Sequence, residues 1–303
     1  MNTHFGNFSH VLVTGATGLV GSHVVDNLLA KGFKVRAVVR SKDKADAFRK
    51  SRKLYTQQLD FYFIRDLTDP DVFVAAVEGI DGVLHIASPL KYDIVDKEKE
   101  LVVPAIRGVL SLLDAAAKSK VKRIVLTSSF GAVLDMGRPE STPWTYSGND
   151  WNPITYDETV APQATPQDAY RGSKTFAEQE AWNFVDQRSP GFDLVTLCPS
   201  MIFGPLATSP TSPNDLNESN KMLWKVATRG PLEPLPLPLQ LLDRCKRFGR
   251  ASRVGSHDGR RRRQKICPSC TRAVYLSASP GDDSNAPSMS VDELFNRCAG
   301  HQD

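Results

Sequence analysis

Cysteine is scarce in this sequence, and long apolar runs are missing from it. Five cysteines among 303 residues provide no disulfide framework. No apolar stretch approaches the roughly 20 residues of a membrane-spanning helix, and residues 1–10 are too polar for the core of a signal peptide. A content of 41% hydrophobic and 24% charged residues excludes fibrous and wholly disordered proteins. We therefore expect a globular, cytoplasmic protein with no membrane partner.

Charge is distributed unevenly along the chain. Through residue 229, 26 Lys and Arg residues balance 26 Asp and Glu residues, so residues 230–303 supply the whole net charge of +4. The excess lies in a block that contains the four-arginine run 260–263. Such a block is typical of nucleic-acid or membrane-surface binding, or of an unfolded tail. Nucleic-acid binding would require a basic face on a folded module.

The first 229 residues alternate between short apolar runs and segments with helical periodicity. Strands are predicted over 11–13, 35–39, 61–64, 83–87, 124–127 and 194–197, and helices over 19–30, 71–77, 97–119 and 176–187. This alternation indicates a parallel sheet covered on both faces, which is the doubly wound α/β architecture. The alternation ends near Arg229, because four prolines between 231 and 238 exclude a helix interior and a central strand. We therefore predict an α/β domain over 1–229 and a basic, poorly ordered tail over 230–303.

Three glycines spaced three apart join the first strand to the first helix. Gly15 can take the tight turn, Gly18 lets a pyrophosphate approach the backbone, and Gly21 lets the helix lie close to the strand. The amides of the first helical turn attract the anion. The position after a strand and before an amphipathic helix favours a dinucleotide site over an ordinary turn. The predicted cofactor contacts in this segment are Gly15, Thr17, Gly18, Leu19, Val20 and Gly21.

The end of the second strand indicates the choice of cofactor. NAD enzymes commonly carry a carboxylate there, whereas a cation accommodates the additional phosphate of NADP. Arg40 offers a planar fork to a phosphate, and Lys44 adds a second positive charge. The alternative is a solvated basic loop, which is the interpretation we prefer for Lys42. The sequence therefore predicts NADP, bound as NADPH.

A phenol and an ammonium group four residues apart, Tyr170 and Lys174, would share one face of a helix. A nearby positive charge would lower the pKa of Tyr170 from its usual value of about 10 and make it an acid at neutral pH. A chance surface pair is the alternative. The hydroxyl side chains of Thr127, Ser128 and Ser129 follow the fifth strand, at the edge where open α/β sheets bind ligands. A hydroxyl at this edge can hold a substrate carbonyl.

Together these motifs resemble the extended short-chain dehydrogenase/reductases, and most closely the dihydroflavonol-4-reductase-like branch with fungal aldehyde and ketone reductases. The resemblance covers residues 11 to about 228 and includes Asp66-Leu67, 85–89 (His-Ile-Ala-Ser-Pro) and 198–205 (Cys-Pro-Ser-Met-Ile-Phe-Gly-Pro). It implies a Rossmann fold and an NAD(P)-dependent oxidoreductase acting on CH-OH groups. The implied reaction is hydride transfer from NADPH to an aldehyde or ketone.

The resemblance also implies roles for single residues. Ser129 would be the catalytic serine, Tyr170 the acid that protonates the carbonyl oxygen, and Lys174 the residue that binds the nicotinamide ribose and depresses the tyrosine pKa. The other implied cofactor contacts are Asp66 and Leu67 at the adenine, Ala87 and Ser88 at the middle of the cofactor, Pro199, Ser200, Met201 and Ile202 at the nicotinamide, and Thr127. No metal is implied.

Two other functions of the same fold stay open. A nucleotide-sugar epimerase or dehydratase usually carries an acidic pair beside the hydroxyl of the fifth strand, whereas Phe130 and Gly131 follow Ser129 here. A non-catalytic NADP-binding regulator usually lacks the tyrosine and lysine pair, which this chain keeps. We expect a monomeric carbonyl reductase whose partner is a small carbonyl substrate.

The tail departs from the family after about Arg229. Residues 242–250 can be encoded by CTG GAT CGA TGT AAG AGA TTT GGC CGA, and translation from the second base gives Trp-Ile-Asp-Val-Arg-Asp-Leu-Ala, a family strand that this chain lacks. The same shift over 264–267 gives Lys-Arg-Tyr-Val, a second missing family segment. These matches predict a frameshift or a misassigned splice site near Arg229, and a truncated or disordered C-terminal substrate lobe. They argue against a metal site at Cys267 and Cys270 and against a nucleic-acid partner.

Overall fold

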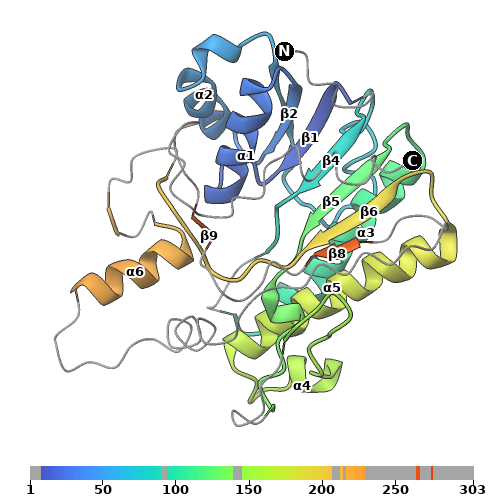
Figure 1. The fold of residues 1–303 in the computed structure, drawn as a ribbon, viewed down its shortest axis with the longest axis vertical. Helices are drawn as coiled ribbons and strands as arrows, with labels where there is room; N and C mark the ends of the chain where they lie inside the picture. The colour runs from blue at the N-terminus through green and yellow to red at the C-terminus, as the bar shows by residue number, and fades with distance from the viewer. Residues whose placement is uncertain are drawn as a thin grey trace.

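The computed structural model of the protein describes residues 8–89, 94–138, 145–206, 212–213, 216–228, 264–266 and 274–275. A twisted parallel sheet lies at its centre, with helices on both sides (Figure 1). In spatial order the strands are β3 (Leu59–Phe63), β2 (Lys34–Val39), β1 (His10–Thr14), β4 (Gly82–His85), β5 (Arg123–Thr127), β6 (Asp193–Leu197) and β8 (Gln264–Ile266). Every neighbouring pair is parallel. This order confirms the predicted doubly wound sheet.

Both faces of the sheet are buried because successive side chains of each strand point to opposite sides. On β1, Val11 and Val13 pack in a cluster with Leu28 and other residues of α1 (Leu19–Ala30). Leu12, which lies between the two valines, packs into a separate cluster on the other face. A parallel sheet with two apolar faces therefore needs helices on each side.

Two long helices cover the second face. Leu112 and Leu113 of α3 (Val103–Ala117) and Phe184 of α5 (Pro166–Arg188) belong to the cluster that contains Leu12. The helix predicted over 97–119 is divided into a π-helical turn, η2 (Glu98–Val102), and α3. Pro104 lies in the first turn of α3, where its missing amide hydrogen is tolerated. The helix predicted over 176–187 is confirmed within α5, which begins earlier because Thr165 caps it by accepting a hydrogen bond from the Asp168 amide.

The helix predicted over 71–77 is wrong. The chain forms a series of hydrogen-bonded turns there, with the Val74 amide donating to the Asp71 carbonyl and the Val77 amide donating to the Phe73 carbonyl. β-branched valines reduce the helix propensity of this short segment, and Gly79 ends it with a φ of +69°. The apolar spacing still buries Phe73 completely.

Several elements were not predicted from the sequence: α2 (Lys42–Lys50), η1 (Lys53–Tyr55), η3 (Phe130–Ala132), α4 (Tyr156–Val160), β7 (Ile202–Phe203), α6 (Glu218–Thr228), β8 and β9 (Val274–Tyr275). Strand β8 pairs with β6, and β9 pairs with β7. Strands β8 and β9 together contain five residues of the tail. The prediction of a poorly ordered tail included no strand. Most of the predicted tail lies outside the described residues, including the four-arginine run, Cys267, Cys270 and the proposed change of reading frame. Within the described part of the chain, no helix is long and apolar enough to cross a bilayer.

Candidate active site

The glycine loop lies at the carboxyl end of β1. Gly15 has a φ of +66°, which is a left-handed conformation, and its carbonyl accepts a hydrogen bond of 3.0 Å from the Gly18 amide. Gly18 then forms the N-cap of α1. A Cβ atom at Gly21 would overlap the carbonyl group of Gly15, so α1 approaches the loop as closely as predicted. The loop therefore presents backbone amides of the first helical turn with no side chain in front of them.

Thr14 joins this loop to the end of β4. Its Oγ1 accepts hydrogen bonds of 3.0 Å from the amides of Ile86 and Ala87 and lies 2.9 Å from Nδ1 of His85. Because the Thr14 oxygen already accepts from two amides, its own hydrogen is available to donate to Nδ1. Burial, together with the positive charge of Lys174, lowers the pKa of His85 to about 3. His85 is therefore a neutral anchor of the loop and not a proton donor at neutral pH.

A cavity beside the loop brings together residues from four segments that are distant in the sequence. Its lining includes Leu67 after β3, Ala87 and Ser88 after β4, Thr127 of β5 and Lys174 of α5. All five were predicted to contact the cofactor, and the fold places them around one space. Open α/β sheets bind their ligands at this edge.

Asp66 is oriented differently from its neighbour Leu67. Its side chain is exposed, and its Oδ1 accepts hydrogen bonds of 2.8 Å from both the amide and the hydroxyl of Thr68. These hydrogen bonds hold the pKa of Asp66 below its usual value. The carboxylate therefore shapes the turn after β3, and its contact with adenine stays a prediction.

The two adjacent serines after β5 face different partners. The Ser129 hydroxyl is hydrogen-bonded to Tyr170 and also accepts a bond of 3.0 Å from the Gly131 amide. The Ser128 hydroxyl donates to the buried carboxylate of Glu178 instead. Only Ser129 of this pair thus joins the tyrosine, which is the arrangement that the predicted proton transfer requires.

Tyr170 and Lys174 both lie on α5, and the Lys174 Nζ is 6.0 Å from the centre of the Tyr170 ring. Lys174 is buried and donates a long hydrogen bond of 3.5 Å to the Thr127 carbonyl. Burial lowers its pKa to about 8, although the negative charge of Glu178 acts in the opposite direction. The lysine side chain therefore titrates close to neutral pH.

The predicted lowering of the Tyr170 pKa by Lys174 is not found. Burial raises the pKa of Tyr170, and the hydrogen bond from Ser129 offsets only part of that increase. The physical reason is that a phenolate loses more hydration in this buried position than it gains from its polar neighbours. Tyr170 consequently keeps its proton at neutral pH, as a group that donates a proton must.

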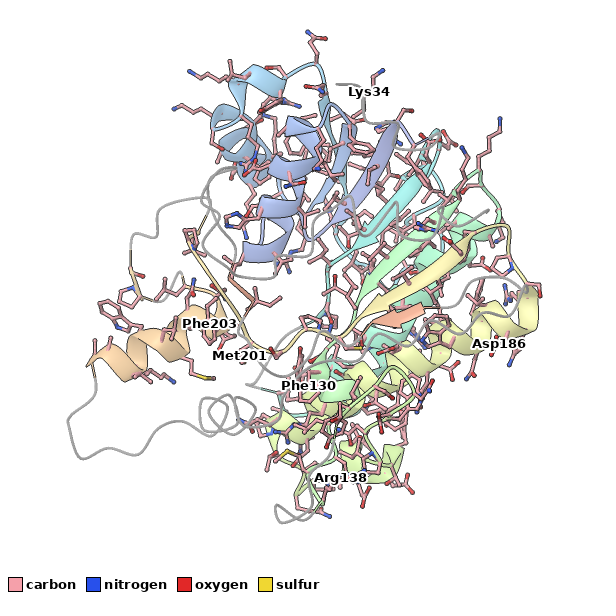
Figure 2. The ribbon with its side chains drawn as sticks, in the orientation of Figure 1. Lys34, Phe130, Arg138, Asp186, Met201 and Phe203 are labelled. Atoms are coloured by element: carbon pink, nitrogen blue, oxygen red, sulfur yellow. The ribbon has the colours of Figure 1, made fainter. Side chains whose placement is uncertain are left out.

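The segment after β6 lies beside the two serines. The Ser128 amide donates to the Leu197 carbonyl at 2.7 Å, and the Phe130 amide donates to the Pro199 carbonyl at 2.8 Å. The chain then continues through Ser200, Met201 and Ile202, which are all half-buried. Figure 2 shows Met201 and Phe203 along the segment that runs from β6 toward α6, with Phe130 nearby at the end of β5. Of the predicted nicotinamide contacts, Pro199 thus lies beside the segment that contains Ser129.

The predicted phosphate contacts lie at the end of β2. Arg40 directly follows the strand and is exposed, and Lys44 is exposed in the first turn of α2. The basic segment is therefore the start of a helix and not a loop. Lys42 donates to Asp46 at 2.7 Å on the same helix, in agreement with its exclusion from the phosphate contacts.

These features fit a dinucleotide. The loop offers open amides to a pyrophosphate, Ala87 beside Gly15 lines the cavity together with Lys174, and Arg40 lies where a ribose phosphate is expected. Among the described residues, no group of three or more His, Cys, Asp and Glu side chains could hold a metal ion. The sequence analysis missed Glu178, although its position four residues after Lys174 places both on one helix face.

Comparison with known proteins shows what the chain is similar to. The profile of the NAD dependent epimerase/dehydratase family matches residues 11–229. An uncharacterized oxidoreductase of Schizosaccharomyces pombe, C513.07, is 36% identical over 218 residues, which is 71% of this chain and 65% of that protein. The NADPH-dependent methylglyoxal reductase of Saccharomyces cerevisiae is 35% identical over 235 residues, 75% of this chain and 68% of that protein.

A solved structure is similar over the same region. The crystal structure of the yeast methylglyoxal/isovaleraldehyde reductase Gre2 complexed with NADPH has a TM-score of 0.68 and 32% identity, covering 75% of this chain and 68% of the yeast chain. The chain thus spans about two thirds of the length of these relatives, 65% to 68%. The residues that match the family, 11–229, include the glycine loop and α5.

Proposed function

Because the chain belongs to the NAD dependent epimerase/dehydratase family, we propose that it is an NADPH-dependent carbonyl reductase that acts on small aldehydes or ketones. The observation that carries the proposal is the hydrogen bond between Ser129 and Tyr170, beside the buried Lys174 and the cavity next to the glycine loop. The yeast relatives named for NADPH and methylglyoxal support the cofactor and the substrate class.

Each residue has a role that its chemistry allows. NADPH, when bound, supplies the hydride that adds to the carbonyl carbon. The Ser129 hydroxyl holds the carbonyl oxygen, and Tyr170 donates its phenolic proton to that oxygen as the alkoxide forms. The proton lost by Tyr170 is recovered from solvent. Lys174, as an ammonium group, favours the transient phenolate and binds the nicotinamide ribose.

The predicted cofactor contacts form the rest of the proposal. The amides of the glycine loop would bind the pyrophosphate, Arg40 and Lys44 the additional phosphate of NADPH, and Leu67 the adenine. The segment 199–202 would contact the nicotinamide. We assign these contacts to residues 1–229 and regard residues 230–303 as a basic tail that lies outside the match to the family. The proposal also holds that the enzyme is cytoplasmic and monomeric.

The observed surroundings of Ser129 disfavour dehydratase chemistry. Phe130, which follows it, packs edge-on against Tyr146 with ring centres 5.4 Å apart, and Gly131 has no side chain. Neither residue can remove a proton from a sugar ring. No observation favours a non-catalytic regulator, because Tyr170 and Lys174 are both present and adjacent on α5.

A Tyr170→Phe variant tests the proposal. We expect turnover to fall by about 100-fold to 10,000-fold, because general acid catalysis is lost, while NADPH still binds. The assay follows NADPH oxidation with methylglyoxal and a panel of small aldehydes and ketones, and NADPH binding is measured by fluorescence titration. Tyr156→Phe is the matched control, since its hydroxyl donates to Glu98 on the surface, at 2.9 Å. Unchanged turnover in Tyr170→Phe would eliminate the proposed acid.

A further inference from the structure

Glu178 is a carboxylate with almost no contact with solvent. Only 1% of its surface is exposed, and it lies on α5 one turn after Lys174, which is 8% exposed. Burying an ionised carboxylate is costly unless it is both hydrogen-bonded and paired with an opposite charge. The proposed hydride transfer makes no use of Glu178, so its presence at this depth requires another explanation.

Four groups donate hydrogen bonds to the Glu178 carboxylate. Oε2 accepts from the Ser128 hydroxyl at 2.5 Å and from the Cys198 thiol at 3.4 Å. Oε1 accepts from the Thr196 hydroxyl at 2.8 Å and from the Trp182 indole at 3.4 Å. The donors come from the end of β5, from β6, from the residue after β6 and from α5 itself. Both oxygens thus receive hydrogens, as the ionised form requires.

The same carboxylate lies among the titratable groups that face Lys174. These are Tyr170 and Glu178 on α5, His85 on β4 and Cys198 after β6. His85 is neutral at physiological pH, and Tyr170 keeps its proton. Burial draws the pKa of Lys174 down to about 8, and the charge of Glu178 is the largest influence in the opposite direction.

We propose that Glu178 is a positioning residue whose carboxylate is the counter-charge that keeps Lys174 an ammonium group and whose bond to Ser128 turns Ser129 toward Tyr170. This inference rests on the proposed function, in which the ammonium group faces the cofactor and Ser129 faces the substrate. Ser128 and Ser129 are adjacent in an extended segment, so anchoring the first hydroxyl on Glu178 directs the second to the opposite side. One buried carboxylate would thus set both the charge and the geometry of the site.

The decisive experiment removes the charge of Glu178 while keeping the size and shape of its side chain. A Glu178→Gln variant is compared with wild type and with Glu180→Gln. The second substitution removes, from the same helix, a carboxylate that accepts an exposed hydrogen bond of 3.1 Å from the Asn183 side chain. The Lys174 titration is followed by NMR of the ¹³C-labelled lysine ε-carbon in the cofactor-free protein. The resonance is assigned by its loss in Lys174→Met.

Loss of the counter-charge should lower the pKa of Lys174. We expect the Lys174 titration in Glu178→Gln to move to lower pH by about one unit or more, whereas Glu180→Gln titrates as wild type does. An unchanged Lys174 titration in a folded Glu178→Gln protein would overturn the proposal. A Glu178→Asp variant keeps the charge but withdraws it by one methylene group, so a smaller shift in the same direction is expected. If Glu178→Gln does not fold, an unmoved titration in Glu178→Asp overturns the proposal instead.

Turnover provides a second and independent measurement. The alkaline limb of kcat/KM for NADPH should move to lower pH by the same amount as the Lys174 titration, which is about a tenfold loss at pH values above both limbs for a one-unit shift. Lower activity with an unmoved limb would indicate a merely structural role and overturn the proposal. If the wild-type protein reduces no carbonyl compound, the proposed function fails, while the NMR titration still decides whether Glu178 is the counter-charge.

Discussion

The glycine loop and the buried face of α5 are the two halves of the proposed site, and they are built from different parts of the chain. In the loop, Gly15, Gly18 and Gly21 leave backbone amides open, and no side chain is needed for the binding of an anion. On α5, the chemistry depends on buried side chains, and Lys174 and Glu178 are there with their charges almost hidden from water. A side chain added at Gly21 would therefore disrupt the first half. Removal of one buried charge would leave the other without its partner in the second half.

The largest expected effect comes from an added atom in the loop half. In Gly21→Ala, the new Cβ would overlap the Gly15 carbonyl, which is backbone that cannot move aside. We expect the free energy of unfolding to fall by about 3 kcal/mol or more, and NADPH binding to be lost with the loop geometry. Urea denaturation and fluorescence titration with NADPH measure the two effects.

Gly32→Ala is the control for this substitution. Gly32 has a φ of +86°, but no atom lies within 4 Å of a Cβ placed there. We therefore expect backbone strain alone to lower the free energy of unfolding of Gly32→Ala, by about 1 kcal/mol. NADPH binding should be unchanged. If Gly21→Ala were no more harmful than Gly32→Ala, close packing of α1 on the loop would not be what the glycine provides.

The next effect comes from a buried, neutral imidazole, His85, which lies where the two halves meet. His85 has a folded pKa of about 3, against an ordinary value of 6.5. At pH values between about 3 and 6.5 the imidazole is protonated in the unfolded chain but not in the folded protein. Lowering the pH below 6.5 therefore favours the unfolded chain, and the folded protein loses stability. We expect about 2 kcal/mol less stability at pH 5 than at pH 7 from this group.

The measurement is urea denaturation of wild type and of His85→Asn at both pH values. The variant has no imidazole to protonate. Between pH 7 and pH 5, its free energy of unfolding should therefore fall by about 2 kcal/mol less than that of wild type. Equal losses in the two proteins would show that His85 is not the group whose burial opposes protonation.

The smallest effect is expected on the surface, where water screens charge. Arg40→Ala should raise the KM for NADPH about tenfold, because one charge-assisted hydrogen bond to the ribose phosphate is lost. The KM for NADH should not change, since NADH lacks that phosphate. Lys42→Ala is the matched control, because Lys42 pairs with Asp46 on α2, and less than a twofold change is expected. An equal rise in both variants would indicate general attraction and not a specific contact.

Much of the loop half could be predicted from the sequence. A left-handed turn and a close helix both require glycine, and the three glycines lie within seven consecutive residues. The spacing of the glycines therefore predicts the geometry of the loop directly. Arg40 was predicted for a similar reason, because it directly follows a predicted strand. The wrong helix over 71–77 shows the limit of periodicity: the apolar spacing that buries Phe73 is present in a series of turns as well.

The other half could be predicted only in part. Tyr170 and Lys174 are four residues apart, and their common helix follows from that spacing. The direction of the Tyr170 pKa did not follow, because it depends on how far burial outweighs the neighbouring groups. The choice of Ser129 over Ser128 came only from the family resemblance, and its physical cause is the position of Glu178, which binds the Ser128 hydroxyl.

The sequence by itself determined the alternation of strands and helices, the glycine loop and the pairing of Tyr170 with Lys174, because each depends on residues that are close together along the chain. Only the tertiary structure showed why Ser129 and not Ser128 meets the tyrosine, which carboxylate anchors Ser128, and in which direction the pKa of Tyr170 moves. Burial and charge interactions act through space, and the solvent that each group loses on folding is set by segments from elsewhere in the sequence.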